Sequence, residues 1–180
     1  MPTHAAFLRG INLGSRRRIG SRELRLHFEE MGFDEVVTFR TSGNVVFTAP
    51  GGAAAETTAR IERGLRDALG YEVAIFLRTA SELLELAGAE PFEARLVSAS
   101  KGKLQVSLLR RAPSANARNT VLKLASDDDR LSFARRELFW LPSGGTRDSA
   151  LDMATIEKLL GPTTMRTKGT VEQLAAKFFG

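Results

Sequence analysis

The chain has 180 residues, of which 43% are hydrophobic and 26% charged, with a formal net charge of +5 and a pI of about 10.1. This composition is typical of a folded globular protein with one domain or two small ones. The chain has no cysteine and only two histidines, His4 and His27, which excludes disulfides and thiolate chemistry and disfavours a histidine-built metal centre. We therefore expect neither a metal nor a cofactor.

The first residues lack the features of a signal peptide, and no apolar run approaches the roughly 20 residues that span a bilayer. We expect a cytoplasmic protein with no membrane partner. The excess of basic residues favours polyanions such as nucleic acid or nucleotides, although plain solubility explains the same balance.

Residues 1–80 show the order strand, helix, strand, strand, helix, strand. The predicted strands are 4–9, 36–39, 44–49 and 71–78, and the predicted helices are 21–31, with Ser21 as N-cap, and 54–69. Thr41-Ser42-Gly43 is the tight connection of a hairpin between the second and third strands. Two split βαβ units in this order give the ferredoxin-like arrangement, an antiparallel sheet with both helices on one face.

Period-two alternation assigns the residues of this first sheet to two faces. The inward set is Leu8, Val45, Phe47 and Ile75, and the outward set is Phe7, Val46 and Phe76. The outward set is too apolar for bare solvent. We expect the second half of the chain to cover it, with the crevice between the halves as the natural pocket.

The second half repeats this order in a degraded form. The predicted elements are a short helix 82–87, a strand 103–109, a helix 113–124, a hairpin of 131–134 with 138–141, and helices 151–160 and 170–179. Asp127-Asp128-Asp129 is predicted to form a turn, Ser149 to cap the helix from 151, and 163–170 to be an interhelical turn with Thr170 as cap. The predicted fold is therefore α+β, with two ferredoxin-like subdomains, 1–80 and 81–180, packed side by side, and two C-terminal helices.

Two stretches join an apolar run to Gly and Asn, namely Leu8-Arg9-Gly10-Ile11-Asn12-Leu13-Gly14 and Thr41-Ser42-Gly43-Asn44-Val45-Val46-Phe47. Glycine permits tight turns and asparagine offers amide hydrogen bonds. The first strand ends where the third begins in an antiparallel ferredoxin-like sheet, so we expect both stretches to form one rim. The candidate ligand-binding residues are Arg9, Gly10, Asn12, Gly14, Ser42, Gly43, Asn44 and Arg166. The alternative is a structural clasp, in which Asn12 and Asn44 satisfy each other's loop backbone.

The loop from Gly10 to Gly20 joins a strand to a helix N-terminus, whose free amides and positive dipole end suit a phosphate or carboxylate. It is neither a Walker loop nor a GxGxxG fingerprint. A basic patch is predicted at Arg16, Arg17, Arg18, Arg22 and Arg25. The open face of the third strand lacks the aromatic residues that an RNA-recognition module uses to stack bases, so nucleic-acid binding would depend on these arginines.

No catalytic residue is assigned. Ser42 and Ser149 have no histidine near them in the sequence, and the adjacent Asp127-Asp128-Asp129 do not have the spacing of a calcium loop. The main hypothesis is binding of an anionic or phosphate-bearing ligand, a small molecule or nucleic acid. One alternative is a metal-independent enzyme on a small anionic metabolite, with His4 as its titrating group. Another is a structural or dimerisation module, and the protein is expected to be a monomer or homodimer.

The two Gly/Asn stretches, the Glu23-Leu24 helix followed by Gly32-Phe33, and the late segments Ser149-Ala150-Leu151, Thr164-Met165-Arg166 and Thr170-Val171 resemble a bacterial family, that of domain of unknown function 1697. The resemblance implies two ferredoxin-like units and carries no known activity, cofactor or catalytic residue. The family's late motif has Asn-Trp after the arginine, whereas Arg166 is followed here by Thr167 and Lys168.

Overall fold

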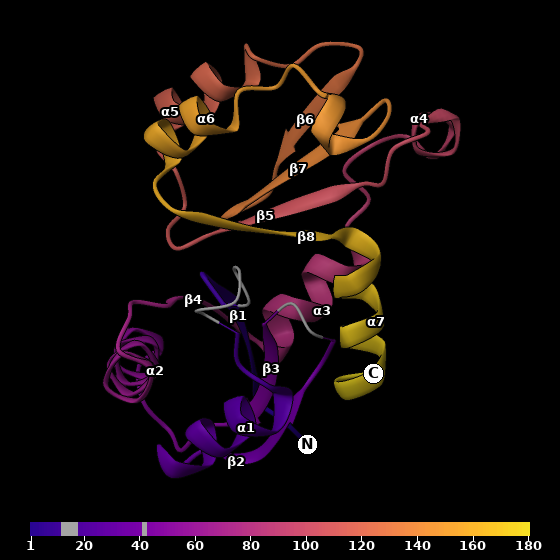
Figure 1. The fold of residues 1–180 in the computed structure, drawn as a ribbon. Coiled ribbons are helices and arrows are strands. Elements are labelled where there is room, and N and C mark those ends of the chain that lie inside the picture. Colours follow the sequence, from indigo (N-terminus) through magenta and orange to yellow (C-terminus); the bar gives the residue numbers. More distant parts are fainter. Residues whose placement is uncertain (12–17, 41–42) are drawn as a thin grey trace. The chain divides into compact units, whose positions relative to one another are not determined.

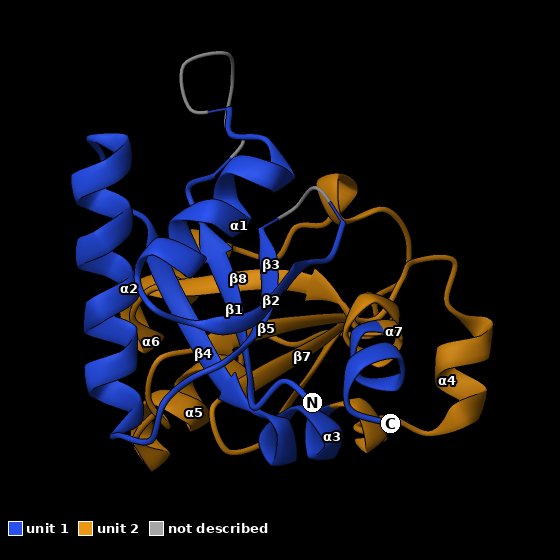
Figure 2. Ribbon diagram, turned by 90° about the horizontal axis from the view of Figure 1, so that it is seen from below, with its two compact units in different colours: residues 1–86, 174–180 blue, residues 87–173 orange. Residues whose placement is uncertain are grey.

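The computed structural model describes residues 1–11, 18–40 and 43–180 (Figure 1). The chain forms two compact units, residues 1–86 with 174–180 and residues 87–173 (Figure 2). The predicted division lies between residues 80 and 81, with the whole C-terminal part in the second subdomain.

The first unit contains a complete ferredoxin-like fold. Its elements are β1 (His4–Arg9), α1 (Ser21–Glu30), β2 (Asp34–Thr38), β3 (Asn44–Thr48), α2 (Ala54–Leu69), β4 (Ala74–Thr79) and the start of α3 (Ala80–Gly88). The strand order is β2-β3-β1-β4 and every pair is antiparallel. The predicted hairpin and the predicted strand–helix order are therefore confirmed.

The core of the first unit lies between one face of its sheet and the two helices. Leu24 and Phe28 from α1 and Ile61 and Leu65 from α2 pack with the inward residues of the strands. Those inward residues include all four that alternation predicts, Leu8, Val45, Phe47 and Ile75. The predicted outward residues Phe7, Val46 and Phe76 are also buried, and what covers them stays a prediction because the units are described separately.

Helix ends in this unit follow local chemistry. Gly70 stops α2 in the left-handed conformation, with φ +79° and its N–H donating to the Arg66 carbonyl at 2.9 Å, as expected for a glycine C-cap. The predicted cap of α1 is wrong by one residue: Ser21 is the first helical residue, and the extended Gly20 is the N-cap without a side-chain hydrogen bond.

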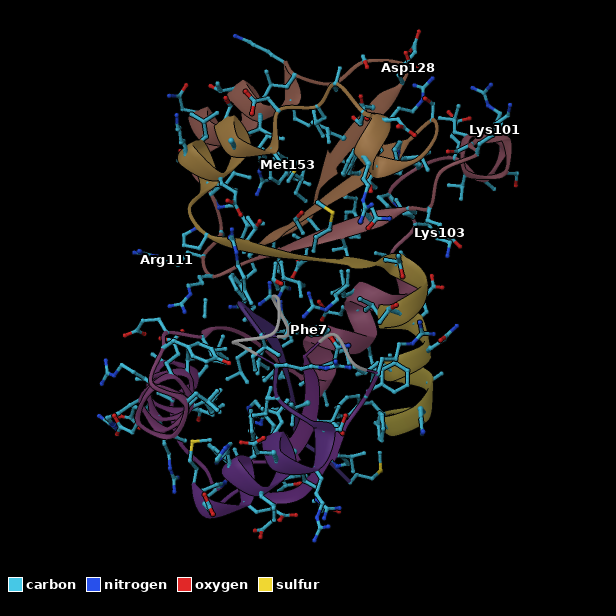
Figure 3. The ribbon with its side chains drawn as sticks, in the orientation of Figure 1. Phe7, Lys101, Lys103, Arg111, Asp128 and Met153 are labelled. Carbon is cyan, nitrogen blue, oxygen red and sulfur yellow. The ribbon has the colours of Figure 1, made fainter. Side chains whose placement is uncertain are left out.

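The second unit repeats the same topology completely. Its elements are α4 (Ala94–Ala99), β5 (Gln105–Leu109), α5 (Ala115–Leu122), β6 (Asp129–Phe133), β7 (Glu137–Pro142), a 3-10 turn (Thr146–Asp148), α6 (Met153–Leu160), β8 (Thr163–Thr167) and the start of α7 (Lys168–Phe178). The strand order β6-β7-β5-β8 is again fully antiparallel. Val121 of α5 and Ile156 of α6 pack on Leu109 and Leu138, and Met153, labelled in Figure 3, joins this core.

The prediction of an interhelical turn over 163–170 is wrong. Thr163–Thr167 is strand β8, which pairs with β5 from Leu109↔Thr163 to Gln105↔Thr167. Helix α7 then begins at Lys168, and Thr167 Oγ1 accepts from the Thr170 N–H at 3.2 Å. Threonine is a good strand former because its branched Cβ packs well on a pleated surface. The degraded repeat is thus a full one, and only α7 is additional at the C-terminal end.

Two further expectations need correction, and one helix was not expected. Helix α6 begins at Met153 with Asp152 as N-cap, whose Oδ1 accepts from the Thr155 N–H at 3.0 Å, so Ser149 is not its cap. Asp129 belongs to strand β6 and not to a turn. Helix α4, which buries none of its residues, was not expected. No helix within the described residues has both the length and the apolar character needed to cross a membrane.

Candidate functional site

The end of β1 and the start of β3 lie side by side in the first unit. Phe7 pairs with Asn44 in the register of the two strands, and the Leu8 N–H donates to the Gly43 carbonyl at 2.8 Å. The two Gly/Asn stretches therefore meet at one end of the sheet, as the antiparallel topology predicts. We call the described residues Arg9, Gly10, Gly43 and Asn44 the rim.

Both glycines of the rim have backbone conformations that favour glycine. Gly10 has φ +87° and Gly43 has φ +76°. A Cβ on Gly43 would lie only 3.1 Å from the Leu8 Cβ, so β1 or the Gly43 backbone would have to shift by a few tenths of an ångström. The glycines therefore allow the two backbone segments to approach closely.

Arg9 supplies the exposed charge of the rim. It is the last residue of β1, pairs with Ala74 of β4, and is exposed. Because facing residues of an antiparallel pair share a face and alternate residues point the same way, Arg9 lies on the sheet face of Phe7 and Asn44.

Asn44 is built into the hairpin. Its side chain is 1% exposed and its Nδ2 donates to the Phe39 carbonyl at 3.0 Å, while the Phe39 N–H donates to the Asn44 carbonyl at 2.8 Å. These bonds join the two ends of the loop between β2 and β3. This geometry is that of a hairpin clasp between Asn44 and Phe39; the predicted partner Asn12 lies outside the described residues.

Some predicted site residues fall outside the described part of the chain. These are Asn12, Gly14, Arg16, Arg17 and Ser42. The other three members of the basic patch, Arg18, Arg22 and Arg25, are exposed, and Arg25 forms a 3.5 Å ion pair with Glu29.

Arg166 belongs to the second unit. It lies in β8 opposite Val106, and its guanidinium donates to Thr164 Oγ1 and to the Met165 carbonyl, both at 2.8 Å. Burial lowers its pKa to about 10, so the side chain is still a cation at neutral pH. The rim belongs to the first unit, so a site shared by Arg166 and the rim stays a prediction.

His4 lies at the far end of β1 from the rim. It pairs with Phe47 and Thr79, whereas Arg9 closes the strand, and the five intervening steps span roughly 17 Å. The ring stacks on Phe47 with 5.7 Å between centroids, and Nδ1 shares a 2.7 Å hydrogen bond with Thr3 Oγ1. Burial lowers the pKa of His4, and the nearby Glu82 carboxylate offsets part of this effect.

The lowered pKa of His4 predicts a small loss of stability in mild acid. The unfolded chain binds a proton at His4 more readily than the folded one, so the stabilisation is complete above the unfolded value of about 6.5 and decreases as the pH falls below it. Urea unfolding at several pH values should show this slope, and His4→Gln should remove part of it. An identical slope in the variant would contradict the assignment to His4.

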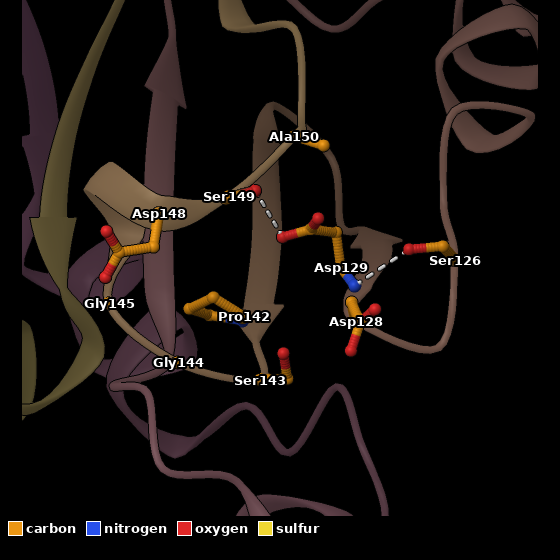
Figure 4. A pocket seen from close by; sticks show the side chains of 10 residues that line it. All are labelled: Ser126, Asp128, Asp129, Pro142, Ser143, Gly144, Gly145, Asp148, Ser149 and Ala150. Carbon is orange, nitrogen blue, oxygen red and sulfur yellow. Dashed lines mark hydrogen bonds between the residues drawn. The ribbon is translucent and has the colours of Figure 1, made fainter.

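The second unit holds a polar pocket that sequence reasoning missed. Its volume is about 310 Å³ and its lining residues are Ser126, Asp128, Asp129, Pro142, Ser143, Gly144, Gly145, Asp148, Ser149 and Ala150 (Figure 4). Asp129, 5% exposed, is the centre of its hydrogen bonds: Oδ1 accepts from Trp140 Nε1 at 2.8 Å and from Ser149 Oγ at 2.6 Å.

The chemistry of this pocket disfavours a serine–histidine nucleophile within the unit and disfavours anion binding. Ser149 donates its hydroxyl to a carboxylate, and residues 87–173 contain no histidine that could take its proton. The carboxylates of Asp128, Asp129 and Asp148 give the pocket negative charge. Among the described residues, no group of three or more His, Cys, Asp or Glu side chains has metal-binding geometry.

Comparison with known proteins agrees with the fold. The chain resembles a solved structure titled "The structure of conserved bacterial protein SP0830 from Streptococcus pneumoniae", with a TM-score of 0.74 and 18% identity over 100% of this chain and 99% of that chain. At this identity the likeness shows the fold alone. No curated protein matches the chain.

The sequence profile described as "Protein of unknown function (DUF1697)" matches residues 1–139, which include both stretches of the rim. The late segments 149–151 and 164–171 lie beyond the matched residues. Since the match covers well over half of the 180 residues, the chain belongs to the DUF1697 family.

Proposed function

We propose that the rim binds an anionic, phosphate-bearing ligand. The observation that carries this proposal is the meeting of the two Gly/Asn stretches, through the bond from Leu8 to Gly43, beside the exposed Arg9. A guanidinium makes charge-assisted and often bidentate hydrogen bonds to phosphate oxygens. Glycine leaves the neighbouring backbone accessible to a ligand.

The N-terminus of α1 and the net charge of the chain also favour a negatively charged ligand. The N-cap of α1, Gly20, makes no side-chain cap hydrogen bond, and the first turn of the helix holds the exposed Arg22 beside Glu23, so the positive end of the helix dipole adds to the basic charge there. The net charge of +5 adds non-specific attraction for polyanions. Within this proposal Asn44 shapes the rim, and Arg9 contacts the ligand.

The two alternatives have different support. An enzyme that uses His4 at the rim is disfavoured because His4 lies at the opposite end of β1. A purely structural role is favoured by the burial of Asn44 and by its bond to Phe39. These roles differ in one measurable property, which is ligand affinity.

We expect Arg9→Gln to weaken binding of inorganic pyrophosphate and of nucleotides about tenfold, because one charge-assisted contact contributes about 1.5 kcal/mol. Isothermal titration calorimetry at low and moderate salt measures this loss. Arg63→Gln is the matched control, since Arg63 is also exposed but lies on α2.

Two results would remove the proposal. One is the absence of binding to any of these anions at low salt by the unaltered protein. The other is an equal loss in the Arg9 and Arg63 variants, which would indicate diffuse attraction by net charge instead of a site at the rim.

A further inference from the structure

Two aromatic rings and two cations gather beside the rim. Phe39 follows β2, and Phe178 is the last residue of α7; their ring centroids are 6.0 Å apart with the planes at 87°. The Arg40 guanidinium lies 5.5 Å from the Phe39 centroid. Lys177 Nζ lies 5.8 Å from the Phe39 centroid and 5.4 Å from that of Phe178. We call these four residues the aromatic–cation cluster.

The cluster differs from the aromatic core of the same unit. Phe28, Phe33 and Phe47 pack on one another with centroid distances of 4.8 to 6.0 Å and are buried. Phe39 and Phe178, by contrast, are only partly buried, and Arg40 and Lys177 are exposed. The rings of the cluster therefore retain surface that solvent or a ligand can reach.

The local backbone keeps the cluster next to the rim. Asn44 of the rim donates its side-chain amide to the Phe39 carbonyl, so this hydrogen bond holds the backbone of Phe39 beside the rim. Arg40 has φ +58°, a conformation that costs a residue with a side chain free energy. On α7, Phe179 is buried whereas its neighbour Phe178 is not, so the end of that helix supplies the second ring and Lys177.

The charge of the cluster has one sign. Residues 36–40 and 174–180, the two segments that form it, contain no acidic residue. Solvent-accessible aromatic rings beside cations are a combination by which proteins bind single-stranded nucleic acid: bases stack on the rings or on a guanidinium plane, and cations contact the phosphates. The partly buried rings of Phe39 and Phe178 beside Arg40 and Lys177 are of this kind. A duplex hides its base faces from such a surface.

We infer that the aromatic–cation cluster binds single-stranded nucleic acid, with a base stacked against Phe39 or Phe178 and the flanking phosphates on Arg40 and Lys177. This inference rests on the proposed function, because it extends the phosphate contact of the rim to a polymer. Base stacking tolerates any base, so the binding has little sequence preference.

The test uses the intact protein and a labelled single-stranded oligonucleotide of about 16 nucleotides, near the upper site size of a single-strand-binding domain. Fluorescence anisotropy should show that Phe178→Leu and Phe39→Leu raise the Kd at least about fivefold. Phe178→Tyr and Phe39→Tyr, which keep the ring, should leave it within about twofold. Lys177→Gln should reduce the slope of log Kd against log salt concentration by about one, the value expected for the loss of one phosphate contact. The control Arg63→Gln should not change the difference in Kd between the leucine variants and the unaltered protein.

Comparison ligands make the inference falsifiable. An abasic strand of the same length should bind more weakly, and so should a duplex and a poly-glutamate peptide. Equal or tighter binding of any of these three would overturn the inference, as would leucine variants that bind like the unaltered protein. Pyrophosphate has no base and tests the phosphate contact alone. If the protein binds pyrophosphate but its affinity for the oligonucleotide does not depend on Phe39 or Phe178, this inference is refuted and the proposed function is left intact. The absence of binding to every anion would refute both.

Discussion

Replacing Asp129 with alanine is expected to lower the free energy of unfolding by about 3 kcal/mol. The substitution removes the acceptor of two hydrogen bonds, those from Trp140 Nε1 and Ser149 Oγ, and leaves a buried indole N–H without that partner. An unsatisfied buried donor costs about 1–3 kcal/mol, and the Ser149 bond adds to this loss. Relief of repulsion from the neighbouring Asp127 and Asp128 offsets part of it.

Asp129→Asn is the matched control, because an amide oxygen can accept both bonds and the side chain keeps its volume. We expect it to retain most of the stability. Trp140 is the single tryptophan of the chain, so its fluorescence during chemical denaturation reports on this bond directly. An alanine variant as stable as the asparagine variant would show that Asp129 does not support the pocket wall.

Sequence patterns predicted the first unit well because its signals are local and strong. Helix 54–69 has a clear apolar stripe between a Pro-Gly-Gly break and Gly70, and α2 occupies those residues. The strands alternate cleanly enough that the predicted inward set, from Leu8 to Ile75, is part of the core. From these strands alone, the antiparallel topology brings the two stretches of the rim together.

The second unit was harder because its decisive features are tertiary. Strand β8 consists mainly of threonines and follows Gly161-Pro162. Such a break can precede either a strand or a second helix, and it is the pairing with β5 that makes this segment a strand. The pocket joins residues 126–129 to 142–150 across the β6–β7 hairpin. The three threonines at 163, 164 and 167 were a local signal for a strand, and the repeat of the first unit's order would have required a strand there.

The aromatic–cation cluster shows the same limit at longer range. Its two halves are Phe39-Arg40 and Lys177-Phe178, which lie far apart in the sequence. The arginines of the predicted basic patch have no aromatic residues interleaved with them, so the sequence pattern there did not indicate a base-stacking site. The fold brings them together because residues 174–180 belong to the first unit.

Asn44→Ala should separate a structural role from a binding role. We expect it to lower the free energy of unfolding by about 2 kcal/mol, because it removes the buried bond to Phe39 and leaves a small cavity. The same change at the exposed Asn119 on α5 should alter stability by less than about 0.5 kcal/mol. Chemical denaturation followed by Trp140 fluorescence or circular dichroism measures both.

The affinity of the folded variant then decides between the two interpretations of the rim. If Asn44 only shapes a site at which Arg9 contacts the ligand, Asn44→Ala loses stability, but the folded variant binds pyrophosphate within about threefold of the unaltered chain. Arg9→Gln should then lose affinity and keep its stability. If Asn44 itself also contacts the ligand, Asn44→Ala loses stability and affinity together. A loss of stability in both variants, with no anion bound by either or by the unaltered protein, would instead assign the two Gly/Asn stretches to the fold alone, because residues that only hold β1 against β3 have no ligand to lose.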